Sequence, residues 1–289
     1  MNGIMKTMLI FTDFSENAFR AAEYGAFVAG SLQIERIILY SAYQALLVGT
    51  DLPNSYIKNS QEIYLETMEN LGLLHDRVKT MTDGKIKVDM VAEETTLPGT
   101  INNFMKTEGV DIAVMGVSGK AGIEKLLLGS TTSKMIEASD VPVLIVPKET
   151  PIGHKFNSII FTTDLKDATV VPVHQLYKFL DAFPVPVRVV NVESPAKDSR
   201  FDINTKEAIT DLHKIFAKYN AAFDYLDDRD IVDTVLDYAD RYEASMIIMV
   251  PKKQGFFASI FNKSISKKLA YHSNIPMLSL PPLMTEKRE

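Results

Sequence analysis

Three glycines near the middle of the chain have a spacing that could bind an anion. Gly116, Gly119 and Gly129 form the pattern G-x2-G-x9-G, and Ser130 follows the last of them directly. Because glycine has no side chain, the backbone at such positions can approach a phosphate while its N–H groups point toward it. The spacing predicts a phosphate-binding loop, although three glycines could also mark ordinary loop turns.

The elements expected around this loop favour the phosphate-binding interpretation. The sequence predicts apolar strands over 110–115 and 141–146, on either side of the loop. Between them, Ser130 is a suitable N-cap for a helix over 131–139, and helix N-termini attract anions. A strand, a glycine-rich loop and a helix in this order form the usual context of a nucleotide phosphate site.

Composition limits the classes of protein to which this chain can belong. It has 289 residues, of which 46% are hydrophobic and 24% charged, which indicates a soluble globular protein of about two domains. The net charge of −6 argues against a nucleic-acid partner. The absence of cysteine excludes disulfides and thiolate chemistry, and no apolar run reaches the length of a membrane span. We therefore expect a cytoplasmic protein with no membrane contact.

The chain contains two copies of the same series of elements. Residues 8–13 recur as 159–164, and from the fourth strand onward the two halves align without a gap at an offset of 134 residues. The short segment 147–153, with Pro147, Pro151 and Gly153, is a stiff linker. We therefore predict one domain over residues 1–147 and another over residues 154–283.

Short apolar strands alternate with helices in each half. The helix expected over 17–31 has alanines and Gly25 on one face, which lets it lie close to a sheet, and a second helix has Tyr64, Met68, Leu71, His75 and Val78 at helical spacing. Alternation of this kind produces parallel strands joined by right-handed crossovers. Each half should be a doubly wound sheet, with its ligand beyond the carboxyl ends of the strands at the switch point.

Together, these features resemble the universal stress protein family, and in particular its tandem two-domain members. The resemblance rests on the strand end Phe11-Thr12-Asp13-Phe14-Ser15, the glycine spacing, and the last strand of the first half, Val141 to Pro147. It implies an α/β fold like that of the adenine nucleotide alpha hydrolases, with two tandem doubly wound parallel five-stranded sheets of order 3-2-1-4-5. It also implies a pseudo-twofold pair joined through the fifth strands.

The resemblance further implies an adenine nucleotide, ATP or AMP or ADP, in the cleft of the first domain, and leaves open whether Mg²⁺ accompanies it. Asp13 would lie at the base of this site, although a carboxylate there could equally cap the next helix. The family's binding positions correspond here to Thr12, Asp13, Tyr40, Ser41, Ala42, Met115, Gly116, Gly119, Gly129, Ser130, Thr131 and Thr132.

The second half departs from this pattern. Val250, Lys253 and Lys263 stand where the first half has Gly116, Gly119 and Gly129, and only the hydroxyl of Ser264 is retained. Lysines in this segment could hold an anion, but a solvated charged face explains them better. We expect one nucleotide per chain, bound by the first domain.

Residues for catalysis are less evident. The five histidines are scattered, and the sequence has neither a Walker A lysine nor a GxSxG elbow. Three hypotheses follow: a nucleotide-binding stress or signalling module, an ATP-hydrolysing or nucleotidyl-transferring enzyme, and an interaction scaffold that binds no nucleotide. The first fits the residues best, with weak ATPase activity left open. Beyond the intramolecular pair, the sequence leaves open whether the whole chain forms a homodimer and indicates no other protein partner.

Overall fold

The computed structural model describes residues 5–44, 59–97, 99–117, 130–193, 203–228, 230–251 and 274–283, and only the backbone of 130–133, 193 and 232. In the first half the elements are β1 (Thr7–Phe11), α1 (Glu16–Ala29), β2 (Arg36–Tyr43), α2 (Ser60–Met81), β3 (Lys87–Glu94), α3 (Ile101–Thr107), β4 (Ile112–Gly116), α4 (Ser130–Ala138) and β5 (Val143–Val146). The second half contains β6 (Ser158–Thr163), α5 (Val173–Ala182), β7 (Val187–Glu193), α6 (Ile203–Phe216), the 3-10 turn η1 (Ala217–Tyr219), β8 (Ala222–Asp227), α7 (Ile231–Arg241), β9 (Ala244–Met249) and β10 (Met277–Ser279).

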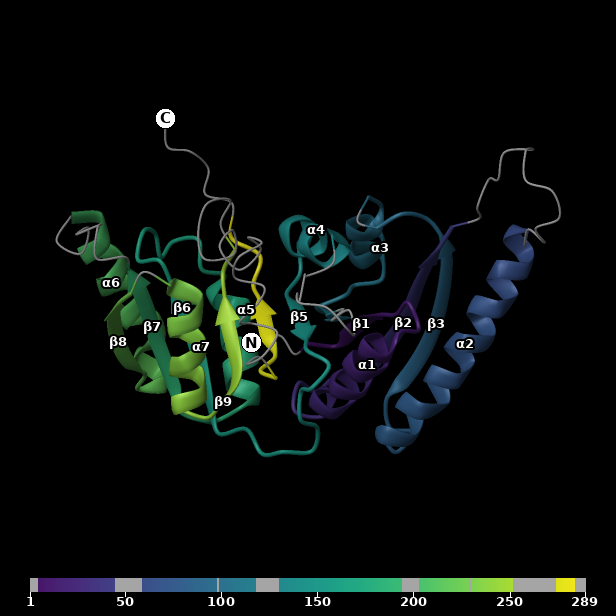
Figure 1. Cartoon of the computed structure of the whole chain (residues 1–289), viewed down its shortest axis with the longest axis horizontal. Coiled ribbons are helices and arrows are strands. Elements are labelled where there is room, and N and C mark those ends of the chain that lie inside the picture. The colour runs from purple at the N-terminus through teal and green to yellow at the C-terminus, as the bar shows by residue number, and fades with distance from the viewer. Residues whose placement is uncertain are drawn as a thin grey trace.

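The strands of both halves form a single sheet in the order β3-β2-β1-β4-β5-β10-β9-β6-β7-β8 (Figure 1). Each half contributes the order 3-2-1-4-5, as expected, with parallel neighbours. The halves meet through an antiparallel pair of β5 and β10, in which Leu144 faces Leu278. The predicted pairing of fifth strands is confirmed, and it satisfies backbone groups that two separate sheet edges would leave unpaired.

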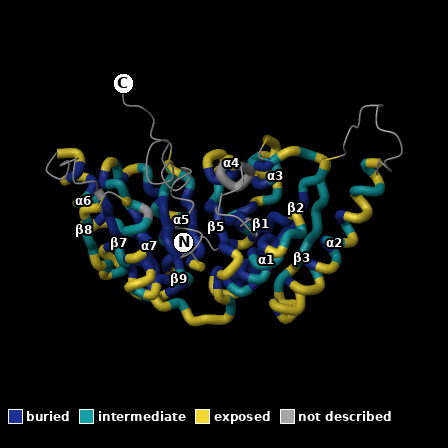
Figure 2. The backbone as a smooth tube through the Cα atoms, viewed as in Figure 1, coloured by how far each residue is buried: buried dark blue, intermediate teal, exposed yellow. Residues whose placement is uncertain are grey.

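Helices cover both faces of this sheet. Helices α1, α2, α5 and α6 contribute to the apolar cluster on one face, and α3, α4 and α7 contribute to the cluster on the other. The central strands are dark blue in Figure 2, and Met8, Leu9 and Ile10 of β1 are fully buried. Strands buried on both faces have continuous apolar sequences, which is why they could be predicted from the sequence.

Two helices differ in detail from the expectation. Helix α2 buries Thr67, Leu71, Leu74 and Val78, whereas Tyr64 is exposed, because its inward stripe lies a fraction of a turn from the predicted one. Helix α4 begins at Ser130 itself, so this residue belongs to the first turn and does not precede it. Its position after the glycine loop is otherwise as predicted.

The linker between the halves is held against α1. Arg20 donates two hydrogen bonds to the carbonyl oxygen of Thr150, at 3.0 Å from Nε and 2.7 Å from Nη2. Lys148 pairs with Glu16 at 2.9 Å. The division into domains 1–147 and 154–283 remains a prediction, since the sheet and both apolar clusters run through the two halves.

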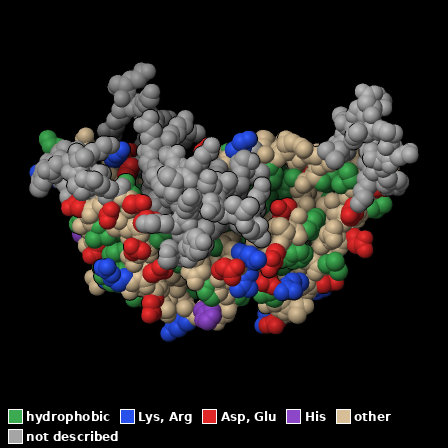
Figure 3. Space-filling view, in the orientation of Figure 1, with side chains coloured by type: hydrophobic (Ala, Val, Ile, Leu, Met, Phe, Trp, Pro, Cys, Tyr) green, Lys and Arg blue, Asp and Glu red, His purple; other side chains and the backbone are tan. Residues whose placement is uncertain are grey.

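Acidic and basic side chains are interspersed over the described surface visible in Figure 3, in keeping with the modest net charge of −6. Among the described helices, none is long and apolar enough to cross a membrane.

Candidate functional site

The turn between β1 and α1 is fixed by three polar side chains. The hydroxyl of Thr12 accepts a bond from the Phe14 N–H at 3.0 Å, and Asp13 Oδ1 accepts from the Ser15 N–H at 3.0 Å and its hydroxyl at 2.5 Å. Phe14 adopts the left-handed conformation with φ of 60°. Ser15 then caps α1 by accepting from the Ala18 N–H. Asp13 thus supports the capping residue and does not cap the helix directly.

The second half repeats this turn but not the helix start. Leu165 has φ of 55°, its N–H donates to the Thr163 hydroxyl at 3.1 Å, and the Lys166 N–H donates to Asp164 at 3.2 Å. However, α5 begins only at Val173. The two halves therefore share the strand end and differ in how the next helix approaches the sheet.

The close approach of α1 to the sheet explains why a glycine stands at the end of β4. A Cβ on Gly116 would overlap the backbone carbonyl of Asn17 in the first turn of α1. At the equivalent position, Val250 is accommodated as a partly buried residue that packs against the apolar cluster. Gly116 is therefore required for close helix packing, whatever further use its bare backbone has.

A cavity of about 530 Å³ lies beyond the carboxyl ends of β1, β2 and β4. It brings together six of the predicted site residues: Thr12, Asp13, Tyr40, Ala42, Met115 and Gly116. The chain passes from β1 to β2 and β3 on one side and then to β4 on the other, so the switch point lies between β1 and β4. Ligands of doubly wound sheets bind at this place.

Tyr40 forms a rigid aromatic wall of this cavity. The residue is fully buried, its hydroxyl donates to Glu93 at 2.5 Å, and its ring contacts those of Phe104 and Phe11 at centroid distances of 5.0 and 5.6 Å. Burial, together with the bond to Glu93, raises the pKa of Tyr40. Since the hydroxyl is bonded to Glu93 and the residue is fully buried, Tyr40 fixes the shape of the cavity wall and leaves no polar group free for a ligand.

The described walls of the cavity contain no lysine or arginine. Asp13 is exposed at the rim, whereas Ser41 is buried and is not among the lining residues. An anionic ligand would therefore depend on backbone N–H groups, a bound cation, or residues beyond these walls. Among the described residues, no group of three or more His, Asp or Glu side chains is arranged to hold a metal ion.

Other predicted site residues lie outside the described part of the chain. These are Gly119 and Gly129 with the rest of the loop, the side chains of Ser130, Thr131 and Thr132, and, in the second half, Lys253, Lys263 and Ser264. Their roles remain predictions.

Sequence reasoning missed a second wall of the cavity. Thr95, Thr96 and Leu97, which follow β3, line it. The signal was available, because the carboxyl end of every parallel strand points to the same edge of the sheet. What the sequence did not specify is which of these strand ends comes near the switch point.

Comparison with known proteins gives consistent matches. The model of the universal stress protein family matches residues 5–147. The universal stress protein MJ0531 of Methanocaldococcus jannaschii is 30% identical over 148 residues, which are 50% of this chain and 84% of that protein. The universal stress protein YxiE of Bacillus subtilis is 27% identical over 146 residues, covering 48% of this chain and 97% of its own length.

One solved structure extends the similarity to the second half. A universal stress protein from Archaeoglobus fulgidus aligns with 95% of this chain and 98% of its own, with a TM-score of 0.67 and 17% identity. At this identity the alignment shows a shared fold of two linked halves.

Proposed function

Because this chain belongs to the universal stress protein family, we propose that its first half binds an adenine nucleotide and that the protein acts as a nucleotide-dependent stress-response or signalling module. ATP is the nucleotide we propose first, with AMP and ADP as relatives that the same cavity would accept. We also propose that it acts in the cytoplasm. The observation that carries the proposal is the cavity at the switch point between β1 and β4.

The size and walls of the cavity suit a nucleoside. Its volume of about 530 Å³ lies within the range of small-molecule sites, about 300 to 1,000 Å³. Met115 and Leu97 supply apolar surface for a base, with Tyr40 packed behind this wall, while Asp13 and Thr96 supply polar groups at the rim. The base would lie toward Tyr40 and Ala42, and the ribose toward Asp13.

The phosphates would then extend toward Gly116 and the N-terminus of α4. Since α4 joins the carboxyl end of β4 to the amino end of β5, its N-terminus belongs to the edge of the sheet that holds the cavity. Helix N-termini supply N–H groups and a positive dipole end to anions. Mg²⁺, where present, would be held mainly by the phosphates, as is usual for this ion, with Asp13 as the nearest carboxylate in the cavity wall.

A cavity-filling variant tests this proposal. Ala42→Phe places a ring in the cavity and should abolish ATP binding in calorimetry while thermal unfolding stays close to that of the parent protein. Ala92→Phe is the matched control, because Ala92 lies on the neighbouring strand β3 and packs against the cluster on the other face of the sheet. Unchanged ATP affinity in Ala42→Phe would contradict the proposal.

Incubation with labelled ATP and Mg²⁺ distinguishes binding from turnover. We expect nucleotide that is retained intact on the timescale of the experiment, since Asp13, the carboxylate on the cavity wall, is already bonded to Ser15. Release of labelled phosphate that is lost in Ala42→Phe would instead support the enzyme hypothesis.

A further inference from the structure

An ion pair between Lys148 and Glu16 joins the carboxyl end of β5 to the amino end of α1. Lys148 comes two residues after β5, and its Nζ is 2.9 Å from Oε2 of Glu16, the first residue of α1. The phosphates of a nucleotide carry several negative charges, whereas the described walls of the switch-point cavity contain neither lysine nor arginine. A lysine near this cavity is therefore a candidate for the missing positive charge.

Both partners of this ion pair adjoin Gly116, which lines the cavity. On one side, Val146 at the end of β5 is paired with Gly116 in the sheet. On the other side, the backbone of Asn17, next to Glu16, is what a Cβ on Gly116 would overlap. Lys148 and Glu16 thus meet beside the residue toward which the phosphates of the proposed ligand extend.

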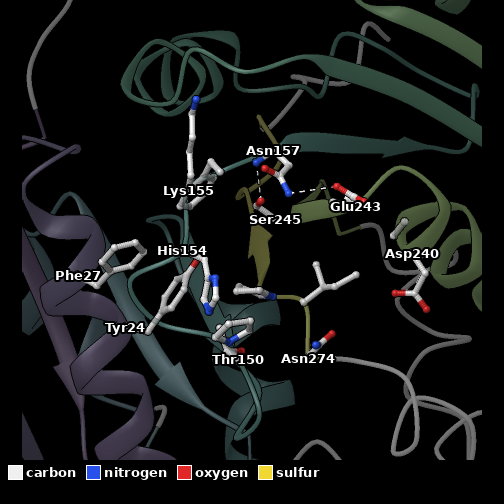
Figure 4. A pocket seen from close by; sticks show the side chains of 16 residues that line it. Tyr24, Phe27, Thr150, His154, Lys155, Asn157, Asp240, Glu243, Ser245 and Asn274 are labelled. Atoms are coloured by element: carbon white, nitrogen blue, oxygen red, sulfur yellow. Dashed lines mark hydrogen bonds between the residues drawn. The ribbon is translucent and has the colours of Figure 1, made fainter.

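The backbone of the linker that carries Lys148 is held in place by α1. Arg20, in the second turn of α1, donates two hydrogen bonds to the carbonyl oxygen of Thr150. Figure 4 shows Thr150 and Tyr24 of α1 at a cavity of about 300 Å³ between the halves, with Asp240 of α7 on its far side. Because the linker is anchored in this way, the side chain of Lys148 can move while its backbone stays in place.

The side chain of Lys148 can also change its partner at little cost. Lys148 is 41% exposed and Glu16 is 78% exposed, and exposed ion pairs contribute little to stability. Glu16 does not depend on the lysine, because a carboxylate in the first turn of a helix is stabilised by the positive end of the helix dipole. A phosphate group has more negative charge than a carboxylate and attracts the same ammonium group.

We propose that Lys148 is a specificity-determining residue of the nucleotide site, and that it exchanges its bond to Glu16 for a bond to the phosphates of the bound nucleotide. This inference rests on the proposed function of the first half and assigns the positive charge that the described cavity walls lack. The ammonium group acts only on the phosphates, so ATP should bind more tightly than AMP, and AMP more tightly than adenosine.

Calorimetry of the full-length protein with ATP, AMP and adenosine tests the proposal. In Lys148→Met, which keeps an unbranched side chain and removes the charge, ATP binding should weaken about tenfold, as expected for the loss of one bond to a charged group. Adenosine, which has no phosphate, should bind equally to Lys148→Met and to the parent protein. Lys148→Arg, which keeps the charge, should retain most of the ATP affinity.

Two controls separate this effect from a change in the fold. Lys85→Met removes the cation of another exposed ion pair, with Asp83, and should bind ATP like the parent, because Lys85 precedes β3 and the cavity lies at the carboxyl ends of the strands. The Tm of nucleotide-free Lys148→Met should stay close to that of the parent, since the lost ion pair is exposed.

The results distinguish a failure of this inference from a failure of the proposed function. Equal ATP affinity in Lys148→Met and the parent protein, or equal losses for ATP and adenosine, would overturn the role of Lys148 alone. A parent protein that binds none of the three ligands would overturn the proposed function, and the role of Lys148 with it.

Discussion

Gly116 at the end of β4 lies directly against the backbone of Asn17 in the first turn of α1. Any side chain at position 116 would overlap the Asn17 carbonyl, so this contact sets how closely the helix can approach the sheet. The same contact fixes two walls of the cavity, since Gly116 lines it from β4 and Ala18 lines it from α1. A packing requirement and the shape of the proposed nucleotide site thus depend on one residue.

The first prediction concerns this contact. Gly116→Ala should destabilise the protein by about 1 to 3 kcal/mol, the usual cost of overpacking, because backbone atoms are the obstacle and cannot rotate away. Urea unfolding measures the change in the free energy of unfolding.

Gly72→Ala is the matched control for this substitution. Gly72 is inside α2, and an added Cβ there meets nothing within 4 Å. Alanine should therefore stabilise the protein by about 0.5 to 1 kcal/mol through its better helix propensity. If Gly116→Ala is as stable as the parent protein, the contact between Gly116 and the Asn17 backbone does not restrict the residue type at position 116.

The second prediction concerns acid stability at the outer edge of the first half. Asp89 on β3 accepts bonds from Arg36 at 2.6 Å and Lys87 at 3.0 Å. Burial alone would raise the pKa of Asp89, but these two bonds outweigh it and lower the pKa. Because the pKa is lower in the folded than in the unfolded chain, the carboxylate stabilises the protein above the unfolded value of about 4.

This stabilisation is lost as the pH falls through the folded-state pKa. Asp89→Asn should therefore be less stable than the parent protein at neutral pH, and the difference should shrink below about pH 4. Urea unfolding across a pH series measures it. Asp83→Asn serves as control, because Asp83 and its partner Lys85 are both largely exposed and such pairs contribute little. A difference for Asp89→Asn that stays constant with pH would refute the assignment.

The third prediction concerns the junction of the halves. Leu144 and Leu278 are paired across the β5–β10 junction and both are fully buried. Leu278→Ala should cost about 2 to 5 kcal/mol, and both halves should still unfold in one transition, since the sheet and its two apolar clusters are continuous.

Circular dichroism during urea unfolding measures how many transitions the chain shows, and hydrogen exchange measures the protection of each half separately. Leu65→Ala, at an exposed position of α2, should change stability by no more than about 0.5 kcal/mol. Protection lost in the second half while the first stays folded would show that the junction is not cooperative.

Much of the fold could be predicted because its strands are apolar on both faces. Runs such as Met8 to Phe11 and Val143 to Val146 are buried throughout, and their alternation with helices indicated a doubly wound sheet in each half. The strand order 3-2-1-4-5 came from the family resemblance. The face of α2 was placed less well, since several neighbouring stripes of that helix are apolar enough to be buried.

The residues of the site were predicted from two sources. Gly116 was found through the glycine spacing, and Thr12, Asp13, Tyr40, Ala42 and Met115 were assigned through the family resemblance. The packing reason for Gly116 could not be predicted, because it depends on where α1 lies in space. Thr95 and Leu97 were missed because their type is unremarkable and only the sheet order brings them to the cavity. The roles of Gly119, Gly129 and Ser130 to Thr132 stay predictions.

The number of nucleotides bound by each chain tests the central claim most directly. Titration of the full-length protein with ATP and Mg²⁺ in a calorimeter should saturate near one equivalent per chain, because only the first half combines the switch-point cavity with the glycine spacing. The Ala42→Phe variant should then show no residual binding. Two equivalents per chain, or one equivalent that survives in Ala42→Phe, would contradict the account.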